Sequence, residues 1–337
     1  MRRQLSSAVR RASAVALAVT AAVTAAVAMA PGLLGAQGGL STEGALFVLV
    51  PVGARSAATG RATAASEFGT ESLWGNPAGI ARMVKRELAL HHSQSIFATG
   101  EVLGFVYPAG KAGVVAFGAQ LYDYGAQDDT DDAGTVTGQL LPRSVVVAAT
   151  YAATLGAHFR AGLSYKFVQL RQDCTGPCTS GEAFSGSTNG LDAGMQYATG
   201  RGDSLTLGVA VRSLGLKLQV KDNAQSDPLP SRLHLGVQAL VPAVARALPG
   251  AQLRWAAEVV SRTSLDGPAV HLGGELALHE QLYLRAGYAT GTGDGTGPAF
   301  GLGFVRGRLG VDFAREFTGL SADLGQPPTY LTLRVSF

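Results

Sequence analysis

The sequence predicts an all-β protein, a transmembrane antiparallel β-barrel of about fourteen strands. The first observation is composition: the chain has 337 residues, of which 47% are hydrophobic and only 15% charged, and it contains 45 glycines. It is therefore too apolar for a disordered chain and too glycine-rich for a helical protein. The second observation is an alternation of apolar and polar residues in segment after segment. The third is an alternation of short and long connections between these segments.

The first 36 residues have the pattern of an export signal. Residues 1–36 begin with basic residues, continue with an apolar run rich in Ala and Val, and end in small residues, which predicts a cleaved secretory signal peptide. A membrane anchor is the alternative, because the run from Ala12 to Ala30 is almost long enough to span a bilayer. Cleavage would remove four arginines and no acidic residue, so the formal charge would fall from +3 to −1. The basic surplus therefore belongs to the signal and does not suggest a nucleic-acid partner.

Period-two segments fill the rest of the chain. In Ala157–Phe167 one parity reads Ala, Phe, Ala, Leu, Tyr, Phe, whereas the other reads His, Arg, Gly, Ser, Lys. Side chains alternate between the two faces of a strand, so each such segment predicts a strand with one apolar and one polar face. The fourteen predicted strands are residues 87–93, 101–108, 112–122, 143–153, 156–170, 188–199, 204–213, 231–241, 251–261, 269–278, 281–290, 298–306, 308–316 and 329–337.

The connections between these strands alternate in length. Most of the short ones have two to five residues, as at 109–111 and 306–307, and 242–250 is the one longer member of this set. The long ones are 123–142, 171–187, 214–230, 262–268, 291–297 and 317–328. Short periplasmic turns alternating with long outer loops are typical of a transmembrane β-barrel, and an even strand number predicts that both chain termini lie on the periplasmic side.

A soluble sandwich or soluble barrel is the alternative, with the apolar face inside. Strands of about ten residues instead match a tilted membrane crossing, and only 7% of the residues are aromatic and available to fill a large interior. We therefore expect the apolar face to contact lipid and the polar face to line a lumen. Both signs of charge occur on that face, which favours ion pairs across the lumen over an ion path. The polar residues are Arg160, Lys166, Arg232, Arg254, Arg285, Arg334, Asp192, Glu258, Glu275, Asp312, His158, His234 and His271.

The two cysteines predict a disulfide. Cys174 and Cys178 stand four residues apart in a predicted outer loop, and export implies an oxidising compartment. A metal site is the alternative, but neither a histidine nor a second cysteine pair accompanies them. The acidic run at residues 128–132 could hold Ca²⁺ in principle, but no EF-hand pattern completes it, so a solvated loop is favoured. We therefore expect no metal and no cofactor.

Catalytic motifs are missing from the sequence. It has no GxSxG elbow, HExxH helix, Walker loop or Rossmann fingerprint. The glycine-rich stretch at 291–297 lies between two predicted strands, so no helix N-terminus is available there to bind phosphate. We therefore expect a protein that is not an enzyme.

The last predicted strand ends in an aromatic residue, Phe337, on its apolar parity. Exported chains that end this way resemble outer-membrane barrels, whose last strand is recognised by the barrel assembly machinery. Behind a signal peptide and fourteen alternating segments, this ending favours the cell outer membrane as the location, with its lipid and lipopolysaccharide as partners.

Two neighbouring motifs then resemble a known family. The stretches FVLVPVGARSAATGRATAA (47–65) and LWGNPAGIA (73–81) are similar to the start of the PorV/PorQ family, a branch of the FadL-like fatty-acid-transporter barrels. Further stretches fit the same pattern, including GLSYKFVQ (162–169), GLDAGMQYA (190–198), LTLGVAVRSLG (205–215) and LYLRAGYATG (282–291). The most specific part is the pair of motifs formed by Gly53, Ala54 and Arg55 and by Asn76, Pro77, Ala78 and Gly79.

The resemblance implies an N-terminal segment folded into the lumen as a plug. Residues 37–86 would form this plug and residues 87–337 the barrel. PorV-like relatives serve type IX protein secretion, so a docking role for secretion subunits or cargo domains is the first functional expectation. The alternative is a channel for long-chain fatty acids or other hydrophobic small molecules. The channel would need a dry pocket between plug and wall, whereas docking would need exposed hydrophobic loop surface, some of which lies in 214–230. The residues expected to build the pocket are Leu46, Phe47, Leu49, Phe68, Leu73 and Trp74.

The segment ESLWGNPAGIARM (71–83) predicts a short helix within this plug. Asn76 is suited to cap a helix, and Pro77 suits its first position, since the missing N–H would have no partner there. We expect a helix from about Pro77 to Met83, loosened by Gly79. Trp74 is expected to anchor the plug by packing against the wall.

Overall fold

The computed structural model describes residues 43–178, 181, 183–200, 202–220, 226–261, 268–290, 295–318 and 324–337. They belong to one compact unit that begins at Thr42. The predicted signal peptide, residues 1–36, lies outside the described residues. Within the described part of the chain, no helix is long and apolar enough to cross a membrane.

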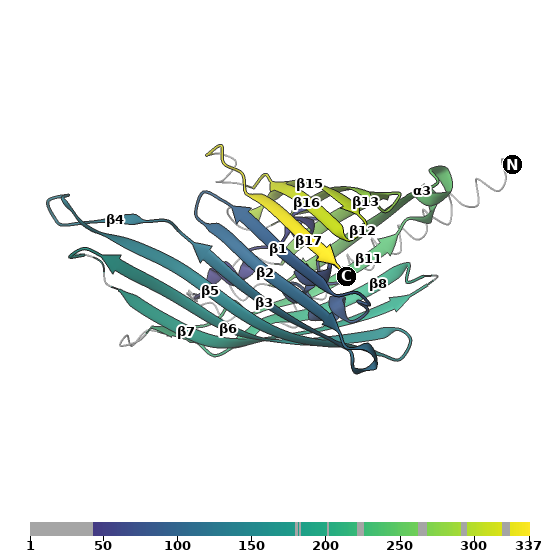
Figure 1. The fold of residues 1–337 in the computed structure, drawn as a ribbon, viewed down its shortest axis with the longest axis horizontal. Helices are drawn as coiled ribbons and strands as arrows, with labels where there is room; N and C mark the ends of the chain where they lie inside the picture. Colours follow the sequence, from purple (N-terminus) through teal and green to yellow (C-terminus); the bar gives the residue numbers. More distant parts are fainter. Residues whose placement is uncertain are drawn as a thin grey trace. The chain divides into compact units, whose positions relative to one another are not determined.

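Fourteen antiparallel strands close into a barrel, which confirms the predicted fold class (Figure 1). Three short strands, β4 (Gln127–Thr130), β9 (Leu218–Val220) and β10 (Ser226–Asp227), lie outside this ring. The wall strands are β1 (Glu87–Gln94), β2 (Thr99–Pro108), β3 (Val114–Asp123), β5 (Val136–Leu155), β6 (Phe159–Thr175), β7 (Phe184–Thr199), β8 (Leu205–Gly215), β11 (Arg232–Leu240), β12 (Ala251–Val260), β13 (Ala269–Leu278), β14 (Leu282–Ala289), β15 (Gly297–Arg306), β16 (Leu309–Glu316) and β17 (Thr329–Ser336).

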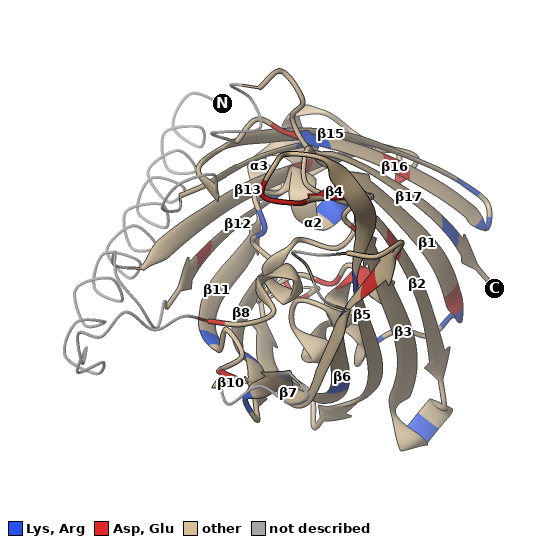
Figure 2. Ribbon diagram, turned by 90° about the vertical axis from the view of Figure 1, so that its left-hand side faces the viewer, with Lys and Arg blue, Asp and Glu red and all other residues tan. Residues whose placement is uncertain are grey.

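The ring closes between its first and last strands. β1 pairs with β17 in one unbroken register, from Glu87 opposite Ser336 to Gln94 opposite Thr329. Figure 2 shows the strands surrounding the lumen from the end where β4 lies. Between β7 and β8 the register shifts between Leu191 and Ala193. The other neighbouring wall strands pair in continuous antiparallel register, so residues of the same parity share one face of the sheet.

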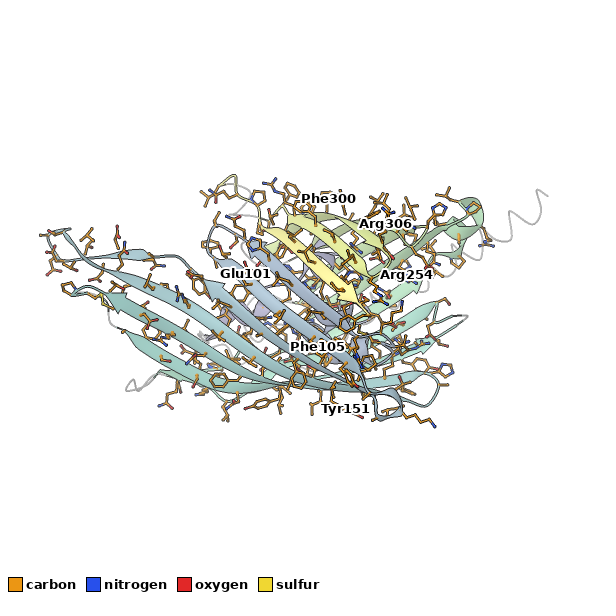
Figure 3. All side chains as sticks on the ribbon, viewed as in Figure 1. Glu101, Phe105, Tyr151, Arg254, Phe300 and Arg306 are labelled. Atoms are coloured by element: carbon orange, nitrogen blue, oxygen red, sulfur yellow. A yellow bond between two sulfur atoms is a disulfide. The ribbon has the colours of Figure 1, made fainter. Side chains whose placement is uncertain are left out.

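The apolar faces point outward, as expected. Phe300 is one of the outward side chains of β15 (Figure 3). Phe300, Leu302 and Phe304 are about half exposed, whereas Gly301 and Gly303 between them are buried. This is the reverse of a soluble barrel, and it presents an apolar belt that fits a lipid environment. The interior carries the polar parity of each strand.

Strands β5, β6 and β7 are longer than the sequence predicts. They have 20, 17 and 16 residues, and they project beyond their neighbours together with β4 (Figure 1). Their additional residues fall in the long connections 123–142 and 171–187. The apolar and polar residues do not alternate cleanly there, because this part of the sheet has no lipid-facing side to bury. One other connection contains a helix, α3 (Pro242–Ala247), and the turn after β2 contains η5 (Gly110–Ala112).

Residues 43–86, here called the plug, lie inside the ring of strands (Figure 2). Apart from Arg61 and Glu67, every residue from Pro51 to Ala81 is buried. The plug has little regular structure, because most of its backbone follows the inner surface of the wall. Its elements are η2 (Leu46–Leu49), α2 (Ala54–Ala58), η3 (Gly69–Leu73) and η4 (Pro77–Ile80).

Glycines line the wall where the plug touches it. A Cβ at Gly208 would lie 2.0 Å from the carbonyl oxygen of Ala64, so only glycine allows this approach. A Cβ would also come within 3.0 Å of a plug atom at other wall glycines on several strands. The high glycine content thus serves the contact between wall and plug. These other glycines are Gly118, Gly162, Gly194, Gly236, Gly273, Gly287 and Gly301.

Candidate functional site

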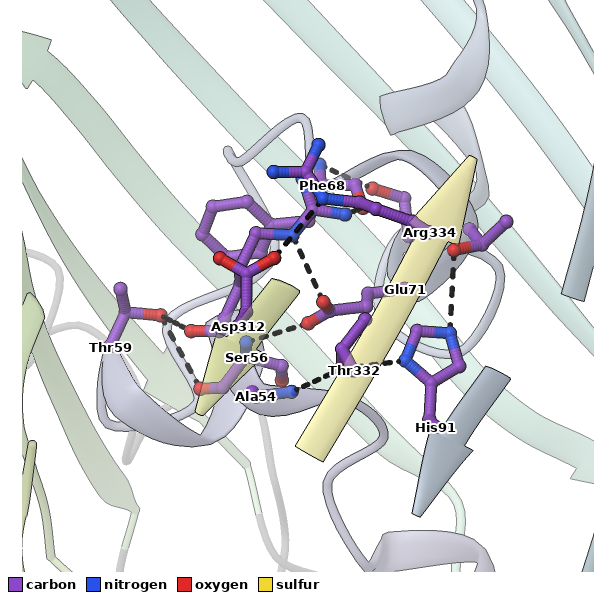
Figure 4. Close-up of polar contacts among 12 residues, drawn as sticks. Ala54, Ser56, Thr59, Phe68, Glu71, His91, Asp312, Thr332 and Arg334 are labelled. Atoms are coloured by element: carbon purple, nitrogen blue, oxygen red, sulfur yellow. Dashed lines mark hydrogen bonds and ion pairs between the residues drawn. The ribbon is translucent and has the colours of Figure 1, made fainter. Parts of the chain in front are cut away.

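The first half of the predicted motif pair forms a buried ion pair inside the plug. Arg55 Nε donates to Glu71 Oε1 at 3.0 Å, and Ser56 N donates to Glu71 Oε2 at 2.8 Å (Figure 4). Arg55 also donates to the carbonyl of Phe68. Burial is the largest influence on the pKa of Arg55 and lowers it, but the carboxylates of Glu71 and Glu87 outweigh burial and hold the pKa above its usual value. Arg55 therefore stays a cation and joins α2 to η3.

The start of α2 is attached to the wall. Ala54 N donates to Thr332 Oγ1 at 3.0 Å, and the same hydroxyl lies 2.9 Å from His91 Nδ1 (Figure 4). Thr332 belongs to β17 and His91 to β1, so the contact spans the seam where the barrel closes. Gly53 precedes this helix with φ +84°, a conformation that favours glycine, and a Cβ there would lie 2.2 Å from Glu71 Cδ.

The second half of the motif pair is centred on Asn76. Its Oδ1 accepts from Ala78 N at 3.0 Å, which is the expected cap of η4, and its Nδ2 donates to the carbonyl of Ala64 at 2.5 Å. The same Nδ2 lies 3.3 Å from the carbonyl oxygens of Met195 on β7 and Val209 on β8. One side chain thus caps the helix, ties two plug segments together and contacts two wall strands.

The helix after Asn76 is shorter than the sequence predicts. It is a 3₁₀ helix that ends at Ile80, not an α-helix that continues to Met83. Gly79 limits it, because a Cβ there would lie 2.7 Å from Ser66 O and from Ser72 Oγ. Close packing of three plug turns therefore requires glycine and leaves no room for further helical turns. Ala78 beside it is fully buried.

Trp74 packs against the wall. It is 4% exposed, and a Cβ at Gly118 of β3 would lie 2.5 Å from its ring. The ammonium of Lys166 stands 5.8 Å from the ring centroid, within cation–π range, and pairs with Asp192. The Trp74 contact joins the plug to the charged face of the lumen.

Most of the charged side chains predicted to line the lumen form ion pairs. Arg285 bridges Glu275 and Asp312, with both distances 2.7 Å, and Arg334 Nε lies 3.1 Å from Asp312. The pairing supports a structural use of these charges. His158 is an exception to the predicted placement: it lies exposed in the turn before β6, because the strand begins only at Phe159.

The predicted disulfide and terminal aromatic lie far from the plug motifs in the chain. Cys174, in the last residues of β6, forms a disulfide with Cys178 beyond the strand. Phe337 is 48% exposed, and its backbone exchanges two 3.0 Å hydrogen bonds with Arg86. These two bonds extend the β1–β17 ladder by one pair, so the last residue takes part in closing the barrel.

An outer cavity of about 490 Å³ lies between the start of the plug and the outer ends of strands β1 to β3. Its lining is mostly apolar, which suits a hydrophobic solute. The residues that carry this character are Leu46, Phe47, Val50, Phe97, Ala98, Tyr122 and Leu170.

An inner cavity of about 430 Å³ shares Leu46 and Val50 with the outer one. One side is apolar and includes Leu49 and Val52. The other carries two arginines and two histidines of the wall, and Arg61 and Trp74 of the plug lie on it too. The polar residues are Arg61, Arg212, Arg232, His234, His271 and Glu71. Of the six residues expected to build a dry pocket, Leu46, Leu49 and Trp74 line this cavity, Leu46 and Phe47 line the outer one, and Phe68 and Leu73 line neither.

The alternation in the sequence did not single out Arg212, His91 or Thr332. Arg212 shares its parity with Thr206, Gly208 and Ala210 on β8, so the same pattern could have placed it in the lumen. The contacts that give these residues a role depend on how the plug folds. The plug sequence has no periodic pattern of apolar residues, so its fold could not be predicted.

No protein-family model and no curated protein sequence matches the chain. Solved structures match its fold. The Ralstonia pickettii toluene transporter TbuX has a TM-score of 0.52 at 15% identity, over 84% of this chain and 96% of that one. The P. putida toluene transporter TodX has a TM-score of 0.54 at 13% identity, over 84% of this chain and 96% of that one. A Pseudomonas aeruginosa FadL homologue has a TM-score of 0.52 at 12% identity, over 86% of this chain and 98% of that one. At these identities the likeness establishes the fold alone, and PorV/PorQ membership stays a prediction.

Proposed function

We propose that this protein is an outer-membrane channel for hydrophobic small molecules. The observation that carries the proposal is the pair of adjoining cavities, the outer one largely apolar and both bordered by Leu46 and Val50. Concave, mostly apolar sites with a few polar groups are typical of small-molecule binding. The two transporters of similar fold are described as toluene transporters, which supports the same class of substrate here.

The proposed location follows from the surface of the barrel. Exposed apolar side chains on the outer face of successive strands fit a lipid belt. We infer that the chain is exported behind a cleaved signal at residues 1–36, that residues 37–86 form the plug, and that residues 87–337 form the barrel. Assembly machinery would recognise the last strand, which ends at Phe337, and lipid and lipopolysaccharide would surround the wall.

The two parts of the plug would have different roles. Residues 51–81 are held by buried hydrogen bonds and by wall glycines, so they form the fixed part. Residues 43–50, here called the outer segment, separate the two cavities, and Leu46 in it is 57% exposed. A solute that moves from the outer to the inner cavity would displace this segment without unfolding the rest of the plug.

Uptake by intact cells tests the proposal. Cells that express the chain in a lipopolysaccharide-bearing outer membrane would be compared with cells that do not, by the initial rate of uptake of radiolabelled toluene and radiolabelled oleate. Val50→Asp places a carboxylate between the cavities and should slow uptake by about tenfold, since burying an unpaired charge is costly. Val84→Asp is the matched control, because Val84 is 88% exposed and lines neither cavity. Equal uptake with and without the protein would exclude the channel.

A docking role in protein secretion is the second candidate. It requires exposed hydrophobic surface at the outer connections. Leu214 near the end of β8 is 47% exposed, and Leu216 just after β8 is 72% exposed. Co-purification of the chain with secretion subunits would support this role. If the double variant Leu214→Ser/Leu216→Ser no longer co-purifies with secretion subunits but takes up solute at an unchanged rate, this surface serves secretion and not transport.

A further inference from the structure

The two ends of the barrel carry opposite charge. At the end where β4 lies, the described residues of the long connections 123–142, 171–187 and 214–230 are mostly acidic. Their acidic residues are Asp123, Asp128, Asp129, Asp131, Asp132, Asp173 and Asp227, and their basic residues are Arg171 and Lys217. At the other end, which holds the short connections and is the predicted periplasmic end, exposed basic residues gather near the seam between β1 and β17. They are here called the basic rim and are Lys85, Arg86, Lys111, Arg306 and Arg308.

The basic rim spans successive strands around the seam. Arg86 immediately precedes β1, and Lys111 lies in η5 after β2. Arg306 is the last residue of β15, and the carbonyl of Arg308, just before β16, accepts from Ser336 N of β17 at 2.8 Å. Because β2 pairs with β1, β1 with β17, β17 with β16 and β16 with β15, the rim residues lie at neighbouring strand ends.

The charges of the basic rim have no counter-charge among the described residues. None of its side chains forms an ion pair in that part of the chain. Of the acidic side chains that the structure describes in the short connections, Asp203 is bound by Arg82 and Arg160, and Glu280 before β14 forms no ion pair. Like charges at neighbouring strand ends repel one another, so an anionic partner would stabilise this end of the barrel.

The basic rim borders the lipid-facing belt. Arg86 has the same parity as Leu88, which is 42% exposed on the outer face of β1. Arg306 has the same parity as Phe304, which is 49% exposed on the outer face of β15 (Figure 3). The Arg86 guanidinium stands 4.8 Å from the centre of the Tyr107 ring, an aromatic residue at the end of the same belt. Arginine side chains at a membrane boundary extend their charge to the headgroups while their stems stay against apolar surface, so these cations lie at headgroup level.

We propose that the basic rim binds the headgroup of an anionic phospholipid in the periplasmic leaflet of the outer membrane. The lipid phosphate accepts hydrogen bonds from Arg86 and Arg308, a geometry that guanidinium groups favour, and the acyl chains lie against Leu88 and Leu309. A soluble acidic protein is disfavoured as the partner, because the rim borders the lipid belt. The inference goes beyond the channel and rests only on the proposed location in the membrane.

The bound lipid would also hold the seam together. Neighbouring strands lie about 4.8 Å apart, so the backbones of Arg86 and Arg308, on either side of β17, are about 10 Å apart. Two arginine side chains can reach one headgroup from both sides of that gap. The headgroup would then cancel the repulsion between these cations and link β1 to β16. We therefore expect anionic lipid to raise the unfolding temperature of the barrel.

Two lipids with the same acyl chains test the proposal: dioleoylphosphatidylglycerol, which is anionic, and dioleoylphosphatidylcholine, which is zwitterionic. Each is titrated into the purified full chain in a nonionic detergent, and native mass spectrometry measures the occupancy of the first bound lipid. We expect the anionic lipid to bind at least about tenfold more tightly, since each cation near an anionic membrane surface contributes a factor of about five in affinity. Arg86→Gln/Arg308→Gln should remove this preference and leave the affinity for the zwitterionic lipid within about twofold.

Arg143→Gln/Arg171→Gln is the matched control. It makes the same change of charge at two exposed arginines that lie opposite each other on β5 and β6, at the other end of the barrel. The preference for the anionic lipid should persist in this variant. Lys85→Gln/Lys111→Gln is a second rim variant outside the wall strands, and it should weaken the preference even if the arginine variant fails to fold.

Equal affinity for the two lipids would overturn the inference, as would a preference that survives in both rim variants or is lost equally in the control. Millimolar inorganic phosphate should not displace the anionic lipid, and displacement would show that the rim binds a soluble anion. An unfolding temperature raised by the anionic lipid in the wild type but not in the rim variants would support the role at the seam. Rim-dependent capture of an acidic periplasmic protein, without a lipid preference, would assign the rim to a protein partner and reject the lipid. Uptake by cells tests the channel separately, because no residue of the basic rim lines either cavity.

Discussion

Gly273 of β13 lies directly against the carbonyl of Thr59 in the plug: a Cβ at Gly273 would stand 2.4 Å from that oxygen. The same relationship recurs on other strands, so the wall and residues 51–81 are complementary at the level of single atoms. Such packing favours one docked position, because interiors of this density do not deform continuously. The plug below its outer segment is therefore a fixed part of the lumen.

Gly273→Ala should weaken plug docking. The added methyl must displace the Thr59 backbone, an overpacking cost of about 1–3 kcal/mol. Gly274→Ala is the matched control, since the nearest atom to a Cβ there is 3.9 Å away. Hydrogen exchange by mass spectrometry should show faster exchange for 54–81 in Gly273→Ala and no change in Gly274→Ala. Equal exchange in both variants would contradict the complementarity.

Arg55→Met should destabilise the plug. It leaves the carboxylate of Glu71, which is 2% exposed, without its cation, a loss of about 3–5 kcal/mol for a buried pair. Arg143→Met is the control, because the Arg143–Asp123 pair is exposed and should contribute less than about 1 kcal/mol. Limited proteolysis of folded protein would detect cleavage within 54–81 for Arg55→Met alone. Restoration of protection in Arg55→Met/Glu71→Leu would confirm that the unpaired charge is the cause.

The wall could be predicted from the sequence because each strand has lipid on one side and the polar lumen on the other, so apolar and polar residues must alternate along it. All fourteen strands follow from that constraint, and Phe300 and its neighbours show it directly. Prediction failed where the constraint ends: β5 begins at Val136, not near 143, because its outer residues have no lipid face. The lumen placement predicted for His158 was wrong for a related reason. The alternation in the sequence continues through residues 157 and 158, but these residues form a turn, in which side chains do not alternate between two faces.

The site could be predicted only in part. The glycine and asparagine motifs marked the plug, since Gly53 and Gly79 stand where the chain needs glycine. The cavities could not be predicted, because they depend on where the outer segment crosses the lumen. One signal was available: glycines on the lumen parity of successive strands, such as Gly208 and Gly236, indicate that another backbone approaches there.

Removal of the disulfide should leave the barrel unaffected. Cys174 and Cys178, with a sequence separation of four, close a short loop at the end of β6, so their constraint amounts to about 2 kcal/mol and acts on the local loop. In Cys174→Ser/Cys178→Ser we expect an unchanged midpoint of guanidinium unfolding of the barrel and faster proteolysis near 174–181. A large shift of the midpoint would show that the projecting ends of β5 to β7 unfold together with the wall.

Asn76→Ala should loosen the plug more than Pro77→Ala does. Asn76 provides the cap of η4, about 1 kcal/mol by itself, and contacts backbone carbonyls of Ala64, Met195 and Val209. Pro77 supplies only a preset φ at the first helical position, where an N–H would lack a helical partner. Hydrogen exchange of 54–81 should therefore rise in the order wild type, Pro77→Ala, Asn76→Ala, with the wall strands unchanged. Asn189→Ala is the control, because its side chain bonds the exposed Tyr165 hydroxyl. If Pro77→Ala instead prevents insertion into the membrane, the plug must dock before the wall can close. This segment would then act in folding of the barrel.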